Sequence, residues 1–199
     1  MLTLYHSPKT RSSRFIWLLD ELGTPYEIKL VGIRRRDEGA RDPANPHPHG
    51  KVPAIVHDGA LVFESAAIAL YLTDAFPAAG IGPLVGDPKR GAYLSWLAYY
   101  TGVMEPAFVG KALGFTTTNS TTGWAPTDDV LGHIHAALQK GPYLLGEKFS
   151  AADVLFGSTL LLFGASPLVP QPERFKPYVE RLTARPAYIR AQAKDEGLK

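Results

Sequence analysis

Residues 2–30, LTLYHSPKTRSSRFIWLLDELGTPYEIKL, decide the fold of this chain. Apolar and polar residues alternate at residues 2–4 and again at 26–30, a spacing that predicts two strands. Between them, residues 13–22 place apolar side chains at the spacing of one helix face, after a capping serine, and Gly23 is a suitable stop. A strand, a helix and a strand within about 30 residues form a βαβ unit, so we expect the two strands to be parallel.

A hairpin and a second helix follow the βαβ unit. Residues 32–50 are rich in Gly, Pro, Arg and His, which predicts irregular structure with a short helix near its middle. Strand signals at 52–56 and 61–63 flank Asp58-Gly59, a pair typical of tight turns, and so predict a β-hairpin. Helical spacing then runs from Ser65 to residue 76.

Strand signals largely stop after this point. Residues 77–88 are rich in Pro and Gly and carry little charge, which is typical of a linker. Helices are predicted beyond it, at 89–112, 126–140, 151–164, 174–184 and 186–195. We therefore expect an α+β domain at 1–76, a linker at 77–88 and an all-helical domain at 89–199.

Composition excludes several classes of protein. The chain has no cysteine, which excludes a disulfide scaffold, a thiolate metal site and a cysteine nucleophile, and it suits a reducing cytoplasm. Lys and Arg number 21 against 19 Asp and Glu, a balance that does not indicate nucleic acid as a partner. The basic run at 34–36 is followed at once by two acids and is interpreted as a solvated loop. The N-terminus lacks the pattern of a signal peptide, and no apolar run is long enough to span a membrane.

Two short motifs have both a structural and a functional interpretation. Pro53 enters a strand, where it is either an ordinary edge proline or a cis proline that exposes the backbone of Val52 to an extended peptide ligand. Glu64 and Ser65 stand where a strand ends and a helix begins. They form either a plain helix cap or a site that grips the amino and carboxylate groups of an amino acid.

Hydroxyl groups gather in the loop at residues 7–14, before the first helix. A hydroxyl at a helix N-terminus either caps the helix or donates a hydrogen bond to a thiolate and favours the ionised form. A second motif, Phe149-Ser150-Ala151-Ala152-Asp153, has the spacing of a capping box with a hydrophobic staple, and we assign it to folding.

Other kinds of site are not supported. The sequence has no glycine-rich phosphate loop, and Gly157-Ser158 lacks the following glycine of a nucleophile elbow. The pairs His47/His49 and His133/His135 have poor spacing for one metal, so we expect all four to be solvated and no metal to be bound.

The order of these motifs is more specific than any one of them. Over nearly its whole length the chain resembles a glutathione transferase of the cytosolic type, similar to bacterial members with fungal relatives. The motifs that carry the resemblance are Leu4-Tyr5-His6-Ser7-Pro8, Arg11-Ser12-Ser13-Arg14, residues 17–27, His47-Pro48-His49-Gly50-Lys51-Val52-Pro53, Glu64-Ser65-Ala66-Ala67-Ile68, residues 149–153 and residues 178–188.

The resemblance implies a thioredoxin-like N-terminal domain that binds glutathione as cosubstrate. Pro53 would be the family's cis proline, Val52 would pair with the cysteinyl part, Glu64 and Ser65 would grip the γ-glutamyl group, and Lys51 would reach a carboxylate. The helical domain would supply a pocket for a small hydrophobic electrophile, either from its first helix or with those side chains serving only as core. The candidate pocket residues are Tyr99, Tyr100, Met104 and Phe108. Family members usually form homodimers.

The residue that activates the thiol is the least regular part of the resemblance. Tyr5 lies too early in the strand, and two alignments of the loop bring either Thr10 or Ser12 to the catalytic position, with Ser13 as a helix cap. We therefore expect a Thr10 or Ser12 hydroxyl to stabilise the glutathione thiolate for attack on an electrophilic carbon. Isomerisation, dehalogenation or ether cleavage at the same site, and a non-catalytic binding protein of the same fold, remain alternatives.

Overall fold

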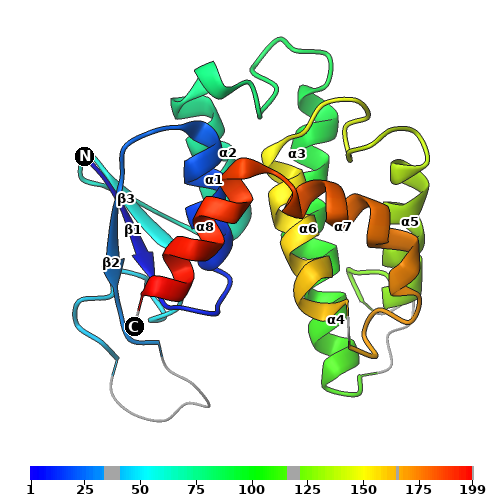
Figure 1. Ribbon diagram of the computed structural model, residues 1–199. Coiled ribbons are helices and arrows are strands. Elements are labelled where there is room, and N and C mark those ends of the chain that lie inside the picture. Colours follow the sequence, from blue (N-terminus) through cyan, green and yellow to red (C-terminus); the bar gives the residue numbers. More distant parts are fainter. Residues whose placement is uncertain (34–40, 116–121, 165, 199) are drawn as a thin grey trace. The chain divides into compact units, whose positions relative to one another are not determined.

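A computed structural model describes residues 1–33, 41–115, 122–164 and 166–198 (Figure 1). The basic run, most of the predicted short helix before residue 41 and most of the threonine-rich loop at 116–122 lie outside the described residues. The chain divides into two compact units, Met1–Ala79 with Arg185–Lys199, and Gly80–Ala184.

The first unit is built on a mixed sheet of four strands. The strands are β1 (Leu2–His6), β2 (Glu27–Leu30), β3 (Ala54–His57) and β4 (Ala60–Phe63). Their order is β2-β1-β3-β4, with β1 parallel to β2 and antiparallel to β3, and with β3 antiparallel to β4. The parallel pair and the hairpin predicted from sequence are thus both confirmed.

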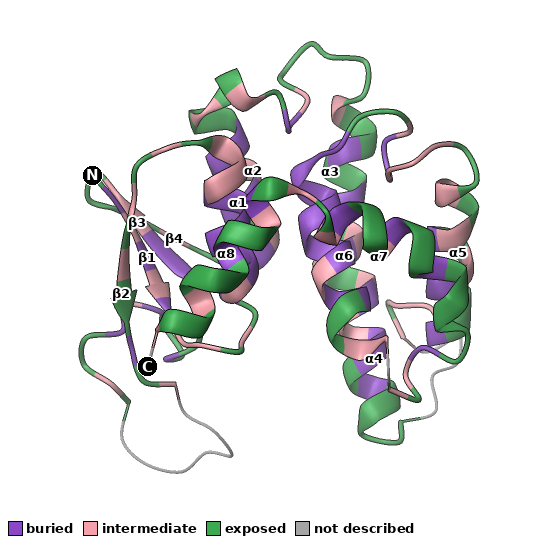
Figure 2. Cartoon of the chain, viewed as in Figure 1, coloured by how far each residue is buried: buried purple, intermediate pink, exposed green. Residues whose placement is uncertain are grey.

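Strand β1 carries the alternation that places the functional site. Leu2, Leu4 and His6 are buried and their neighbours are half-buried, so these three side chains share the inner face of the strand. The edge strand β2, in contrast, is mostly exposed (Figure 2). A histidine on the inner face therefore enters the core of the unit in line with two leucines.

In the described part of the first unit, the sheet is accompanied by the helices α1 (Ser13–Leu22), α2 (Ser65–Ala75) and α8 (Pro186–Gly197), with a short 3-10 turn η1 (Pro77–Ala79) after α2. Helix α1 ends at Gly23 in the left-handed conformation, as predicted. Helix α8 lies beside α1 (Figure 1). It was expected within an all-helical domain at 89–199 but belongs to the first unit, because its Arg185 pairs with Glu21 and its Tyr188 packs edge-on against Trp17.

The second unit is helical. Its elements are α3 (Arg90–Tyr99), a π-helical turn η2 (Tyr100–Met104), α4 (Glu105–Ala112), α5 (Thr127–Leu138), α6 (Ala151–Phe163), a 3-10 turn η3 (Pro172–Phe175) and α7 (Lys176–Thr183). The helix predicted at 89–112 is therefore interrupted by the π turn. Helix α6 is almost entirely buried over its first turns (Figure 2). A thioredoxin-like sheet unit and a helical unit together confirm the expected fold class. Among the described residues, no helix is long and apolar enough to cross a membrane.

Candidate functional site

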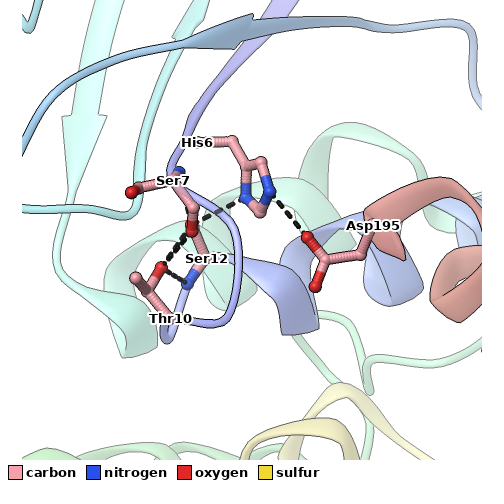
Figure 3. A network of polar contacts seen from close by, with 5 residues as sticks. All are labelled: His6, Ser7, Thr10, Ser12 and Asp195. Atoms are coloured by element: carbon pink, nitrogen blue, oxygen red, sulfur yellow. Dashed lines mark hydrogen bonds and ion pairs between the residues drawn. The ribbon is translucent and has the colours of Figure 1, made fainter. Parts of the chain in front are cut away.

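A chain of polar side chains begins where β1 ends (Figure 3). Nδ1 of His6 lies 2.8 Å from Oγ of Ser12, and Nε2 of the same ring lies 2.8 Å from Oδ1 of Asp195. Oγ of Ser12 is in turn 2.8 Å from Oγ1 of Thr10. His6 and Ser12 are fully buried, whereas Thr10 is half-buried. The chain therefore leads from a side chain that solvent can reach into the core.

The two predicted catalytic hydroxyls thus have different surroundings. Ser12 also accepts a hydrogen bond from the backbone N–H of Ser7 at 3.2 Å, and it has no exposed surface. The Thr10 hydroxyl lies 2.6 Å from the carbonyl oxygen of Ser7 and accepts from the backbone N–H of Ser12 at 3.2 Å. Only Thr10 of this pair can touch a ligand directly.

The expected serine cap of the first helix is wrong in its detail. Ser12 stands at the N-cap position of α1, but among the described residues its side chain makes no capping bond and points to His6 instead. Ser13 is the first residue of the helix rather than its cap. The Ser12 hydroxyl, which could have capped the helix, instead contacts His6 and Thr10.

Helix α8 is held in place by charged contacts of two residues that precede Asp195 in sequence, Arg185 and Lys194. The Arg185 guanidinium donates to both carboxylate oxygens of Glu21, at 2.6 and 2.8 Å, and the Lys194 ammonium pairs with Asp20. Both acids lie on α1, the helix whose N-cap is Ser12. The carboxylate of Asp195 therefore meets His6 from a firmly anchored helix.

The surroundings of His6 favour the neutral ring. Burial lowers the pKa of His6 from its usual value of 6.5, and the charge of Asp195 and its contact with the ring offset only part of that effect. A neutral imidazole carries one N–H. Since the carboxylate can only accept, that proton belongs on Nε2, which leaves Nδ1 as an acceptor facing Ser12.

Acid should destabilise the protein through this ring. The pKa of His6 is lower in the folded chain than in the unfolded chain, so the stabilising contribution of the neutral ring is complete above about pH 6.5 and is lost as the pH falls through the folded value. We expect the unfolding free energy of His6→Gln to depend less steeply on pH between about 7 and 5 than that of the parent protein. Urea unfolding followed by circular dichroism measures both slopes, and equal slopes would contradict the assignment.

A second group of predicted site residues surrounds the start of β3 and of α2. The Val52–Pro53 peptide bond is cis. Lys51 and Glu64 are exposed, Val52 is half-buried, and Ser65 is the buried first residue of α2. Glu64 has φ +70°, a conformation that costs a residue with a side chain about 1–3 kcal/mol and is commonly found at functional sites.

Sequence reasoning missed the residues that hold the loop before Pro53. The Asn45 side chain donates to the carbonyl oxygens of Gly32, at 3.3 Å, and Lys51, at 3.2 Å. The Arg41 guanidinium donates to the carbonyl oxygens of Asn45 and Pro48, at 2.9 and 3.0 Å. The signal in the sequence was an Asn in a loop rich in proline, because an Asn side chain that becomes buried must find hydrogen-bond partners.

One of the four histidines expected to be solvated is not. His47 is only 5% exposed; its Nδ1 accepts from the backbone N–H of His49 at 3.1 Å, and its ring packs edge-on against Phe63. Burial accordingly lowers the pKa of His47. His49 and His133 are exposed and His135 is half-buried. The described part of the chain contains no cluster of three His, Asp or Glu side chains that could hold a metal.

The four candidate pocket residues occupy two environments in the helical unit. Tyr100, Met104 and Phe108 are buried. Oη of Tyr100 lies 2.9 Å from Oγ1 of Thr159 and donates to Glu105, while Phe108 packs near Phe163. Tyr99 is half-buried beside Trp96 and His133. Burial favours a packing role for the first three and leaves Tyr99 as the more accessible candidate.

The motif at 149–153 has the structural role that its spacing predicts. Ser150 and Asp153 form a complete capping box at the start of α6. The fully buried Asp153 carboxylate also accepts from the backbone N–H of Leu144 and from Oη of Tyr178, both at 2.9 Å. These bonds tie α6 to α7 and to the segment before the motif.

Comparison with known proteins identifies the sheet unit first. Residues 1–74 match the family model described as the N-terminal domain of glutathione S-transferase. Glutathione S-transferase 3 of Schizosaccharomyces pombe is 43% identical over 74 residues, 36% of this chain and 29% of that protein. Glutathione S-transferase GstA of Escherichia coli O157:H7 is 26% identical over the full length of both chains. The disulfide-bond oxidoreductase YfcG of Escherichia coli K12 is 26% identical over 77% of this chain and 76% of its own.

Solved structures extend the likeness to both units. A glutathione transferase from Methylococcus capsulatus aligns over 100% of both chains with a TM-score of 0.77 and 25% identity. A sphingomonad glutathione S-transferase complexed with glutathione aligns over 99% of this chain and 100% of its own, with a TM-score of 0.77 and 26% identity. The sheet order and these likenesses agree: residues 1–74 match the N-terminal domain of glutathione S-transferases, and the chain as a whole has the fold of the glutathione transferases with which it aligns.

Proposed function

We propose that this protein is a glutathione transferase that joins the glutathione thiolate to small hydrophobic electrophiles. The observation that carries the proposal is the half-buried Thr10 hydroxyl, which stands just before α1 in the unit that matches the family's N-terminal domain. Relatives crystallised with glutathione, at 26% and 23% identity, support glutathione as the cosubstrate.

The rest of the first unit supplies groups suited to the remainder of glutathione. We place the cysteinyl backbone against Val52, beside the cis bond to Pro53, and the γ-glutamyl group between the Glu64 carboxylate and the N-terminus of α2 at Ser65. Lys51 is exposed and can pair with a glutathione carboxylate. Tyr99 is the candidate for contact with the electrophile. A homodimer in the cytoplasm is the expected form of the enzyme.

One hydrogen bond is enough to make glutathione reactive. Lowering the thiol pKa by about two units requires about 2.7 kcal/mol of preference for the anion. A hydrogen bond to a charged group contributes about 1.5–3 kcal/mol, so a single hydroxyl that donates to the sulfur meets the requirement. The partial positive charge at the start of α1 acts in the same direction.

A thiol–disulfide reaction, suggested by the name of the relative YfcG, is less suited to this chain. The protein has no cysteine, so it cannot itself form a mixed disulfide with glutathione. Isomerisation, dehalogenation and ether cleavage use the same thiolate and differ only in the second substrate. Steady-state rates with a nitro-substituted aryl chloride, an epoxide and an α-haloketone would rank these reactions. Binding of glutathione without turnover of any of them would support a non-catalytic protein and contradict the proposal.

Glu64 should lower the stability of the folded protein through its strained backbone, while its carboxylate should raise the affinity for glutathione. Replacing Glu64 by Gly should raise the free energy of unfolding by about 1 kcal/mol, because glycine adopts a positive φ without strain. The same change should weaken glutathione binding at least about tenfold, because a charged contact is lost. Glu64→Gln should weaken binding without the gain in stability. Asp58→Gly is the matched control, since Asp58 also has a positive φ, in the hairpin turn, and should leave affinity unchanged. Titration calorimetry and urea unfolding measure the two effects, and unchanged affinity in Glu64→Gly would remove Glu64 from the site.

A further inference from the structure

The polar chain behind Thr10 contains a base, His6, that the proposed function does not use. Three consecutive contacts of 2.8 Å connect Thr10 to Ser12, Ser12 to His6, and His6 to Asp195 (Figure 3). A buried histidine with a buried hydroxyl on one nitrogen and a carboxylate on the other has the parts of a general base and its counter-ion. Thr10 at one end of the chain is half-buried, and the Asp195 side chain at the other end is 12% exposed, whereas Ser12 and His6 between them are fully buried.

The carboxylate favours one arrangement of protons in the chain. A neutral His6 ring would carry its proton on Nε2, 2.8 Å from Asp195, which leaves Nδ1 as an acceptor; the Ser12 hydroxyl can then donate to Nδ1 or to the carbonyl oxygen of Ser7 at 3.2 Å. The Thr10 proton then has two acceptors, Oγ of Ser12 and the carbonyl oxygen of Ser7, at 2.8 and 2.6 Å. Both lie inside the loop, so the Thr10 oxygen turns a lone pair toward an arriving ligand.

We propose that His6 takes up the proton of the glutathione thiol through Thr10 and Ser12, with Asp195 as counter-ion to the imidazolium. The inference rests on the proposed function, because it concerns the same thiol. His6, Ser12 and Asp195 are positioning residues in this account, and only Thr10 touches the sulfur.

The proton step balances within the chain. The S–H bond breaks as an O–H bond forms on Thr10, the Thr10 proton passes to Oγ of Ser12, and the Ser12 proton passes to Nδ1 of His6. The products are a thiolate that accepts a hydrogen bond from Thr10 and an imidazolium that donates to both Ser12 and Asp195. After the thiolate has attacked, the proton returns along the chain to water at Thr10 when the product leaves.

Two features favour this role over a purely structural one. Nδ1 of His6 faces the Ser12 hydroxyl and so is placed to receive its proton, and Asp195, which offsets part of the lowering of the His6 pKa by burial, is in place to stabilise the charged ring. Helix α8 does not require the contact to His6 for its attachment, because Arg185 and Lys194 already pair with Glu21 and Asp20 on α1.

The proposal is tested by counting protons released for each thiolate formed. The protein is saturated with glutathione in weak buffer near neutral pH, with thiolate followed by its ultraviolet absorbance and released protons by an indicator dye. S-methylglutathione, which has no thiol proton, gives the background from binding alone. We expect clearly less than one proton released per thiolate in the parent protein, because His6 retains it.

Two variants sharpen the test. His6→Gln keeps a donor and an acceptor but cannot take up a proton, so the amount of thiolate formed should fall about tenfold or more. Each thiolate that does form in this variant should release one proton. Asp195→Asn should also reduce the thiolate, and in both variants kcat should fall about 10²-fold while KM for glutathione stays within about twofold. His57→Gln and Asp128→Asn are matched controls, because the first removes a histidine outside the chain and the second an exposed carboxylate on α5, and both should behave as the parent.

The outcomes are separable. If the parent protein releases one proton for each thiolate formed, proton transfer to His6 is wrong, although the proposed transferase activity still stands. The same holds if His6→Gln forms as much thiolate as the parent protein. If a variant fails to bind S-methylglutathione, the proposal is judged only on the number of protons that the parent protein releases for each thiolate formed. No thiolate in the parent protein at any pH that it tolerates contradicts the proposed function, and the relay with it.

Discussion

Replacing Asp153 by alanine should lower the free energy of unfolding by about 3 kcal/mol or more. The fully buried carboxylate accepts hydrogen bonds from two backbone N–H groups, those of Leu144 and Ser150, and from the hydroxyls of Ser150 and Tyr178. Each buried donor left without an acceptor costs about 1–3 kcal/mol. Burial raises the pKa of Asp153, and these donors offset part of that effect, so the carboxylate and its donors stabilise one another.

Urea unfolding measures this loss, and two further variants locate its cause. Asp153→Asn keeps one oxygen acceptor and should lose less stability than the alanine variant. Asp128→Ala removes an exposed carboxylate in the first turn of α5, paired at 3.5 Å with Lys111, and should cost at most about 1 kcal/mol. A loss below about 1 kcal/mol in Asp153→Ala would mean that these bonds contribute little to the fold.

Thr10→Val should reduce kcat about 10²-fold, the largest effect on catalysis that a single substitution at the proposed site should produce. Valine keeps the shape of the side chain but has no hydroxyl, so the thiolate would lose its direct donor and the proton would lose its first acceptor. Because the proposed glutathione contacts at Lys51, Val52 and Glu64 would be unaffected, KM for glutathione should change much less than kcat.

The control for this substitution is the conservative variant. Thr10→Ser keeps the hydroxyl and should retain most of the activity, whereas Thr183→Val, at the half-buried last residue of α7, should have no effect. Steady-state kinetics at fixed pH with a single electrophile compares all three. Full activity in Thr10→Val would exclude Thr10 as the catalytic residue and return attention to Ser12, which would first have to become accessible.

Local sequence patterns were sufficient for the sheet unit. The alternation in β1 and β2, the Asp58-Gly59 turn and the helical spacing of α1 each specify one element, and short connections leave few ways to assemble them. The capping box at Ser150 and Asp153 was predictable for the same reason, because both members lie within one turn of chain.

Contacts between distant segments were not predictable in this way. The spacing of α8 indicates a helix but not which unit it packs on, so the partnership of Asp195 with His6 has no local signature. The burial of His6 itself could have been predicted, since it continues the inward alternation of Leu2 and Leu4. Tyr100, Met104 and Phe108 share a helical face, and spacing alone cannot distinguish a pocket from a core.

The pKa of the glutathione thiol in the bound state tests the central claim most directly. It is measured by titrating the ultraviolet absorbance of the thiolate across a range of pH, with free glutathione as the reference. The account predicts a midpoint at least about two units below that of the free thiol, shifted back toward the free value in Thr10→Val. A midpoint equal to that of free glutathione in the parent protein would contradict it.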